Sequence, residues 1–322
     1  MSNGTKAALI LGTVLVLIGI IGFCVTMTVN RWDFKRLNTV KYETNTYVVN
    51  DDFQDIVITS ETEDISFVLS GDGTCSVICV EPDKAQHKVS VKDNALSITL
   101  EDSRNWTDNL FSFSSEVPKI TVCLPKNRYG SLHIKESTGD IELPEDFSFE
   151  SIDVTASTGD VKCNASASED LQISLSTGDI RMNRVSAKNL ALTVSTGHVD
   201  VTSAVCSGLF ELKVSTGKTE LTDIRCRSFS TEGDTGRITI NGLIAEDNIS
   251  LVRTTGDVKF EKCDASEIYI KTDTGDIKGT LLSEKIFFAE SDTGSIKVPK
   301  TITGGRCEIT TDTGDIEVSV EE

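Results

Sequence analysis

The sequence predicts an all-β protein, a parallel β-helix or β-solenoid of about ten coils of 19–20 residues, with an N-terminal β cap and one N-terminal transmembrane helix. Three observations predict it. Ten Thr-Gly pairs recur every 19–20 residues between residues 138 and 314, apolar and polar side chains alternate around each of these pairs, and a long uncharged stretch lies near the start of the chain. A constant period well below the length of a βαβ unit is typical of a solenoid with stacked coils.

The uncharged stretch runs from Ala7 to Val29, 23 residues that are long enough to cross a bilayer as a helix. A cleaved signal peptide is the alternative. The apolar part is too long for one and no small-residue cleavage site follows it, so we favour an uncleaved anchor.

The orientation of this anchor is less clear than its span. Only Lys6 precedes it whereas four basic residues follow, so the positive-inside rule alone places the solenoid in the cytoplasm. The imbalance is small and the preceding tail is short. We therefore expect a single-pass protein of the cell membrane with an extracellular solenoid.

Short apolar runs separated by turns predict six strands before the repeats, which we expect to cap the first coil because an open sheet edge invites pairing with another chain. They are Ile56–Ile58, Ile65–Leu69, Val77–Val80, Val89–Val91, Leu96–Leu100 and Ile120–Leu124. At the far end we expect the run Val318–Val320 to form the last strand. Glu321 and Glu322 would then discourage end-to-end stacking, or this end would be a docking surface.

Each repeat glycine should mark a corner that needs a positive φ or a close backbone approach. These structural turn glycines are Gly139, Gly159, Gly178, Gly197, Gly217, Gly236, Gly256, Gly275, Gly294 and Gly314.

Apolar residues flank each corner at period two, which predicts a strand on either side. They lie seven and five residues before the glycine and two and four after it, as at Ile180 and Met182. A further apolar residue, seven after the glycine, should face the core where the chain bends back, from Val185 to Leu282. Ten coils at about 4.8 Å make a rod about 45–50 Å long.

The predicted organisation has five parts. They are a tail at 1–6, the transmembrane anchor at 7–29, a juxtamembrane linker at 30–43, the β-strand cap region at 44–130 and the repeat solenoid at 131–322.

The chain has nine cysteines, an odd total with no disulfide framework. Cys206 and Cys226 both lie nine residues after a repeat glycine, so they should stack in adjacent coils about 5 Å apart, within disulfide range. We favour free thiols and leave a bond open. Six others should be buried in strands, namely Cys75, Cys79, Cys123, Cys163, Cys263 and Cys307.

The run ITVCLPKNRYGSLHIKESTGDIEL from Ile120 to Leu143, followed by serial TGD turns, resembles the bacterial "putative adhesin" family of β-strand-repeat domains, related to toast-rack-like surface modules. The resemblance extends from about residue 44 to the end. It implies a cell-envelope module, adhesin-like or associated with envelope stress, without assigned catalytic residues.

Four repeats replace the aspartate after the glycine, with His198, Lys218, Arg237 and Ser295. The candidate ligand ladder at coil spacing is Asp179, His198, Lys218, Arg237 and Asp257. Such a mixed column is similar to the charged ladders of polysaccharide-cleaving β-helices, where a base abstracts a proton. Relief of repulsion between stacked aspartates explains it better, because coil lengths leave no inserted loop to wall a cleft. We predict no enzyme and no catalytic residues.

Paired carboxylates in the later coils suggest Ca²⁺ as a weaker hypothesis, and we expect no other cofactor. The candidates are Asp273, Asp276, Asp292, Asp312 and Asp315. Asp beside a turn glycine is more often a turn-forming residue. The three histidines, His87, His133 and His198, share no ligand spacing.

The chain carries 50 acidic and 31 basic residues, a net charge of −19, which makes nucleic acid an improbable partner. We expect a membrane-anchored binding module or adhesin of the bacterial envelope, whose partner is an extracellular glycan, a wall polymer or a protein. An envelope-stress sensor is the alternative, and a polysaccharide-acting enzyme is a weaker one.

Overall fold

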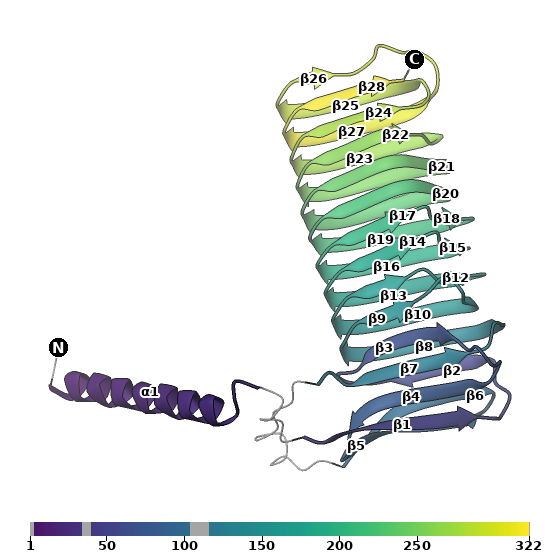
Figure 1. The fold of residues 1–322 in the computed structure, drawn as a ribbon. Helices are drawn as coiled ribbons and strands as arrows, with labels where there is room; N and C mark the ends of the chain where they lie inside the picture. Colours follow the sequence, from purple (N-terminus) through teal and green to yellow (C-terminus); the bar gives the residue numbers. More distant parts are fainter. Residues whose placement is uncertain (1–2, 34–39, 104–115, 322) are drawn as a thin grey trace.

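The computed structural model describes residues 3–33, 40–103 and 116–321, and it confirms the β-solenoid. The stacked coils form a column with the N-terminal strands at its base (Figure 1). Helix α1 spans Asn3–Val29. The base and first corner use β1 (Tyr42–Val49), β2 (Asp55–Thr59), β3 (Asp64–Leu69), β4 (Cys75–Pro82), β5 (Ala85–Lys92), β6 (Ala95–Asp102), β7 (Lys119–Leu124), β8 (Arg128–Thr138) and β9 (Ile141–Leu143).

Most of the middle coils consist of a long strand before the glycine and shorter ones after it, whereas β20 (Thr219–Thr235) and β21 (Ile238–Thr255) each run as one strand from corner to corner. The other strands of these coils are β10 (Ser148–Thr158), β11 (Val161–Cys163), β12 (Ser166–Ala167), β13 (Asp170–Thr177), β14 (Ile180–Asn183), β15 (Ser186–Ala187), β16 (Asn189–Thr196), β17 (Val199–Thr202), β18 (Val205–Cys206) and β19 (Leu209–Thr216). The far end contains β22 (Val258–Cys263), β23 (Glu267–Thr274), β24 (Ile277–Leu281), β25 (Lys285–Thr293), β26 (Ile296–Lys297), β27 (Gly305–Thr313) and β28 (Ile316–Val320).

Neighbouring coils pair in parallel and place equivalent residues above one another. Ile173 pairs with Leu192, and Leu192 with Leu212, and all three are buried. The third apolar position, seven after the glycine, is buried from Val185 to Cys263 as predicted. The prediction is wrong for Leu282, which is 42% exposed, because the register between β22 and β24 shifts by one residue and Leu281 fills the place above Cys263.

The parallel stacking begins before the first Thr-Gly pair. Strand β2 pairs with β8, and β3 with β9, so residues 55–69 form a further coil under Gly139. Its corner reads Thr62-Glu63-Asp64, with glutamate in the place of the glycine. Strands β6 and β7 add one more parallel layer beneath β2 and β3.

Antiparallel strands then close the base. Strand β4 pairs with β7, β1 with β4, and β5 with β6, all antiparallel. The six predicted strands are confirmed as β2 to β7, whereas β1 was not predicted. Cys123 is only half-buried, contrary to prediction, because Val122 and Leu124 on either side face the core.

The last two coils do not stack in chain order. Strand β23 pairs with β27 and β27 pairs with β25, so the coil of Gly314 lies between those of Gly275 and Gly294. Strand β28 lies likewise between β24 and β26. The far end is therefore built from residues 285–297 (Figure 1).

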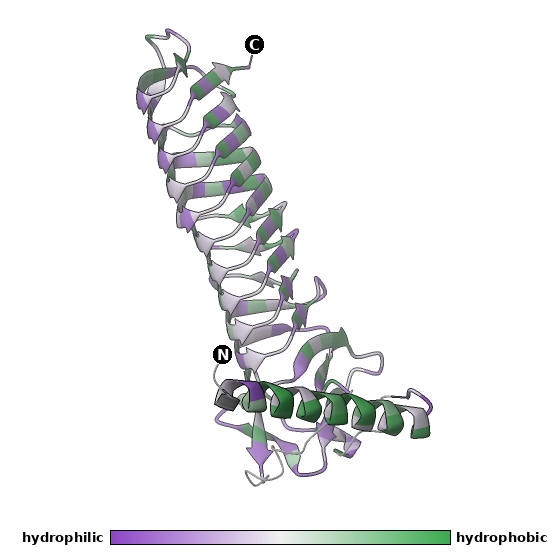
Figure 2. Ribbon diagram, turned by 90° about the vertical axis from the view of Figure 1, so that its left-hand side faces the viewer, coloured by the Kyte–Doolittle hydropathy of each residue, from purple (hydrophilic) through white to green (hydrophobic). Residues whose placement is uncertain are grey.

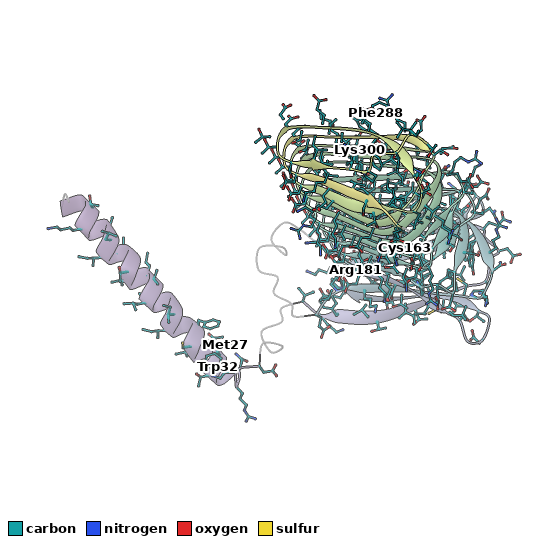
Figure 3. The ribbon with its side chains drawn as sticks, turned by 90° about the horizontal axis from the view of Figure 1, so that it is seen from above. Met27, Trp32, Cys163, Arg181, Phe288 and Lys300 are labelled. Atoms are coloured by element: carbon teal, nitrogen blue, oxygen red, sulfur yellow. The ribbon has the colours of Figure 1, made fainter. Side chains whose placement is uncertain are left out.

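This order corrects the predicted far end, since Val318–Val320 belongs to an internal strand and Glu321 does not close the column. Instead β25 and β26 form the outer edge, and Phe288 is 51% exposed there. Seen from above, Phe288 and Lys300 lie on this end (Figure 3). Ile296, which the repeat pattern placed in the core, is 43% exposed because no coil covers it.

The cysteines of the solenoid carry free thiols. Cys206 and Cys226 belong to one column, since Val205 pairs with Arg225 in the adjacent coil. Burial raises the pKa of both thiols, to about 12 for Cys226. Both are therefore protonated at neutral pH.

Helix α1 is apolar along its length (Figure 2) and is long enough to cross a membrane. The hydroxyls of Thr13, Thr26 and Thr28 donate to carbonyl oxygens four residues earlier, which satisfies them without water. These features fit a single-pass anchor or a signal sequence equally well.

A crosslinking experiment tests the coil order. We expect the double variant Tyr269→Cys/Glu308→Cys to form a disulfide readily, because the two residues are paired in adjacent coils at a Cα separation of about 4.8 Å. The matched variant Tyr269→Cys/Phe288→Cys joins coils that would touch only in chain order. In the observed order they lie about 10 Å apart, beyond disulfide reach. Non-reducing electrophoresis would show the opposite result if the coils stacked sequentially.

Candidate functional site

The aspartate that follows each repeat glycine forms a hydrogen-bonded ladder along one corner of the solenoid. Its Oδ1 accepts the backbone N–H of the equivalent residue in the next coil. Asp140 accepts from Asp160 at 2.8 Å, Asp160 from Asp179 at 2.9 Å, and Asp179 from His198 at 2.9 Å. Asp64 begins the ladder by accepting from Asp140. The TGD motif therefore holds coils together through its aspartate as well as its glycine.

The ladder is interrupted at His198, Lys218 and Arg237. Lys and Arg side chains carry no acceptor atom, so they cannot bind the next N–H group. The ladder resumes at Asp257, which accepts from Asp276 at 3.2 Å. For three successive coils, the side chain after the glycine does not accept the N–H group of the next coil, although Arg237 forms an ion pair with Asp257 of that coil.

The upper part of the ladder follows the inverted coil order. Asp276 accepts from the N–H of Asp315 at 3.0 Å, and Asp315 accepts from the N–H of Ser295 at 2.8 Å. Ser295 belongs to the outermost coil, where no further coil presents an N–H group. An aspartate at this position would have no N–H group to accept, which explains why the TGD pattern is not kept at Ser295.

Three of the five predicted ladder residues come together in one open groove. Lys218, Arg237 and Asp257 line a groove of about 370 Å³ together with Lys259 and Lys278. Asp179 and His198 do not line it. They pair with each other, with His198 Nδ1 3.2 Å from Asp179 Oδ1.

A second groove of about 530 Å³ continues along the same face toward the far end and shares Lys259 and Lys278 with the first. Lys297 and Glu317 lie on its rim. Gly279 also lines it, and the Phe260 ring fills the space beside this glycine, since a Cβ atom there would lie 2.4 Å from the ring. The two grooves together form what we call the groove face, with its basic residues Lys218, Arg237, Lys259, Lys278 and Lys297.

Every cation of the groove face forms an ion pair with a neighbouring carboxylate. The pairs are Lys218 with Glu220, Arg237 with Asp257 (3.1 Å), Lys259 with Glu261 (2.8 Å), Lys278 with Asp276 (2.9 Å) and Lys297 with Glu317 (3.6 Å). All of these side chains are partly exposed. The groove face is thus electrically balanced on a chain of net charge −19.

The inverted coil order contributes to this balance. Lys259 lies beside Lys278, and Glu317 separates Lys278 from Lys297. Stacking in chain order would place the three lysines in one unbroken column. Like charges directly opposite each other on neighbouring strands are destabilising.

The Ca²⁺ candidates are spread over three coils in the spatial order Asp273, Asp312, Asp292, since β27 lies between β23 and β25. Asp276 and Asp315 use Oδ1 for the ladder, and Lys278 Nζ occupies Asp276 Oδ2. In the part of the chain that the structure describes, the only three potential ligands with atoms within 4.8 Å of one another are Cys79, Glu81 and His87.

Sequence reasoning placed the lysines three residues after the glycine on the outer face but did not include them in a site. The available signal was their recurrence as Lys259, Lys278 and Lys297 in three consecutive repeats. The group of Cys79, Glu81 and His87 was missed because its members come from two strands, β4 and β5, and have no regular spacing.

The family model described as Toastrack DUF4097 matches residues 53–210 and 205–322. The chain belongs to this family. The predicted resemblance is thereby confirmed, and no curated protein matches the chain.

Several solved structures of family-like proteins are similar to this chain. One is named a "putative adhesin" from Bacteroides fragilis, with 17% identity and a TM-score of 0.42 over 87% of this chain and 97% of that one. Another is named a "putative lipid binding protein" from Parabacteroides distasonis, with 17% identity and a TM-score of 0.49 over 75% and 98%. A third, a "putative adhesin" from Parabacteroides merdae, has 12% identity and a TM-score of 0.43 over 75% and 97%.

The ladder yields a prediction about stability. Replacing Asp276 with alanine should lower the free energy of unfolding by about 1 kcal/mol, because the N–H of Asp315 and the ammonium of Lys278 both lose their acceptor. Asp312→Ala removes a nearby exposed carboxylate without such a bond and should change stability little. Urea titration followed by circular dichroism measures both, and equal effects would contradict the ladder's role.

The hydrogen bonds of the ladder also determine how the free energy of unfolding changes with pH. The backbone N–H of Asp315 lowers the pKa of Asp276 below its ordinary 3.8, and that of Ser295 lowers the pKa of Asp315. Their stabilisation is complete above the unfolded pKa and is lost as pH falls through the folded one. The stability difference between wild type and Asp276→Ala should therefore shrink below about pH 4.

Proposed function

We propose that this chain is a membrane-tethered, non-catalytic binding module of the cell envelope, and that its groove face contacts an extended glycan. The observation that carries the proposal is the coincidence of two features. The aspartate ladder is interrupted at Lys218 and Arg237, and the same two residues line an open groove. Side chains that do not serve as acceptors in the ladder are thus presented where a ligand has access.

The chemistry of the groove face suits a hydroxyl-rich polymer. It alternates donors on Lys and Arg with acceptors on Asp and Glu, so sugar hydroxyls would find both kinds of partner. Because the face is electrically balanced, it does not repel a neutral chain. Repeated contacts at coil spacing would add up along an extended ligand.

Two features favour binding over catalysis. The grooves are open rather than enclosed, whereas reactions usually take place in concave sites that exclude water. In addition, His198 is paired with Asp179 and lies outside both grooves.

We further propose that α1 is retained as a single-pass anchor and that the solenoid projects outside the cell. The length of α1 and its internally satisfied threonine hydroxyls support a membrane-spanning role. A rod that exposes a repeated polar face serves a binding role best on the outer side.

A matched pair of double variants tests the glycan proposal. Lys218→Ala/Arg237→Ala should weaken binding to isolated envelope polysaccharide about tenfold or more, because each charged hydrogen bond contributes roughly 1.5–3 kcal/mol. Lys162→Ala/Arg181→Ala removes the same charge from coils outside the grooves and should bind normally. Co-sedimentation with insoluble polysaccharide measures both, and equal losses would indicate only a general charge effect.

A topology experiment tests the orientation. With an epitope tag fused after residue 322, protease added to intact cells should remove the tag. A tag that is protected in intact cells and cleaved only after lysis would place the solenoid in the cytoplasm, as the positive-inside count suggests. That result would overturn the extracellular binding proposal.

A further inference from the structure

A group of polar and ionisable side chains is buried at the base of the solenoid, far from the groove face. Cys79 and Glu81 come from β4, His87 from β5, and Glu63 from the corner between β2 and β3. The side chains of Glu81 and His87 are fully buried, and that of Glu63 is 3% exposed. We call these four residues the base cluster.

The position of Glu63 follows from the end of the glycine column. In the coils above, each corner glycine rests on the carbonyl of the corner below, and Gly139 rests on Glu63 in this way. In the next layer down, the 16 residues 103–118 connect β6 to β7, whereas only the four residues 60–63 connect β2 to β3. A glutamate side chain can therefore enter the interior here, where a glycine is required elsewhere.

Glu81 holds the ring of His87 in a fixed orientation. Its Oε2 accepts from the backbone N–H of His87 at 2.6 Å and lies 2.6 Å from Nδ1 of the same residue. Its Oε1 accepts from Asn45 Nδ2 at 2.7 Å and from the Tyr47 hydroxyl at 3.1 Å. A carboxylate on one imidazole nitrogen is the usual arrangement behind a metal-binding histidine.

The other imidazole nitrogen has no hydrogen-bond partner among the residues that the structure describes, although it is buried. His87 Nε2 lies 3.9 Å from Glu63 Oε1. Glu63 Oε2 is occupied by the backbone N–H groups of Glu61 and Thr62, both at 2.9 Å, so Oε1 is the oxygen left to face the imidazole. A buried polar atom without a partner needs an explanation.

The charge of the base cluster points to a cation. In the described parts of the chain, the ion pairs of Glu63 and Glu81 involve only His87, with no Lys or Arg. Two carboxylates buried beside a thiol are costly unless a positive charge compensates them. The Cys79 thiol lies within 4.8 Å of the ligand atoms of Glu81 and His87.

We propose that the base cluster binds one Zn²⁺ ion, with His87 Nε2 and Cys79 Sγ as ligands and Glu81 orienting the imidazole. Glu63 Oε1, which lies 3.9 Å from Nε2, would turn toward the ion as the third ligand. Tetrahedral Zn–N and Zn–O bonds of about 2.0–2.2 Å hold the two donor atoms about 3.4 Å apart, so the 3.9 Å between Nε2 and Oε1 would close by about half an ångström on binding. A nitrogen, sulfur and oxygen donor set suits Zn²⁺ better than Ca²⁺ or Mg²⁺. Binding displaces the thiol proton of Cys79 to solvent. The ion would fasten the β4–β5 hairpin to the first coil.

The test uses the full chain in detergent, freed of metal with a chelator and then titrated with Zn²⁺ or with Co²⁺ as a spectroscopic probe. We expect one Zn²⁺ per chain, a visible Co²⁺ spectrum with a sulfur-to-metal charge-transfer band, and a metal-dependent rise in melting temperature. Cys79→Ala and His87→Gln should abolish the site. Cys75→Ala removes another buried thiol from the same strand and should leave it intact.

The outcomes separate the proposal from a purely structural polar network. A folded wild-type chain that gives no charge-transfer band and no metal-dependent stabilisation would overturn it. So would equal metal uptake by wild type and Cys79→Ala. If Cys79→Ala does not fold, the band in wild type and in Cys75→Ala still decides whether a thiolate binds the metal.

Discussion

Contact between backbones at the glycine corner is the constraint on which the rest of this structure depends. A Cβ atom on Gly197 would lie 1.9 Å from the carbonyl oxygen of Gly178, and the other repeat glycines face similar contacts. Their φ angles, such as 152° at Gly197, are also ones that other residues rarely adopt. Because only glycine fits, each coil must return to the same corner after 19 or 20 residues. The aspartate ladder beside the corner depends on this spacing.

The repeat pattern changes at both ends of the column of corner glycines. At the base, Glu63 replaces the glycine and brings a carboxylate into the interior, where it faces His87. At the other end, Gly294 rests on Gly314 instead of supporting another coil, and Ser295 ends the ladder. Between these two ends, the aspartate ladder is interrupted only at His198, Lys218 and Arg237. Lys218 and Arg237 of the proposed binding surface, and the proposed metal site, thus lie where the repeat rule is broken.

The sequence was sufficient for the coils because their signal is local and repeated. The sequence does not predict the stacking order of the last two coils, since the corners at Gly294 and Gly314 have the same pattern and either could rest on Gly275. The ladder column was predicted, but the grooves were not, and the second one depends on that order because Lys297 and Glu317 both line it. The base cluster was missed since its residues meet only through the antiparallel closure of the base.

The inverted order has a physical rationale in the residues of the far end. Strand β27 pairs on both sides, and its buried Cys307 and Ile309 complete the core between β23 and β25. Strand β25 is the exposed outermost strand. Its Phe288 ring is partly covered by Arg306, whose guanidinium carbon lies 4.9 Å from the ring centroid. Exchanging the coils would bring this phenylalanine beside Tyr269 but would also place Lys297 directly on Lys278. Repulsion between these lysines on the outer face therefore favours the observed stacking order. The repeated apolar core by itself is compatible with either order of the last two coils.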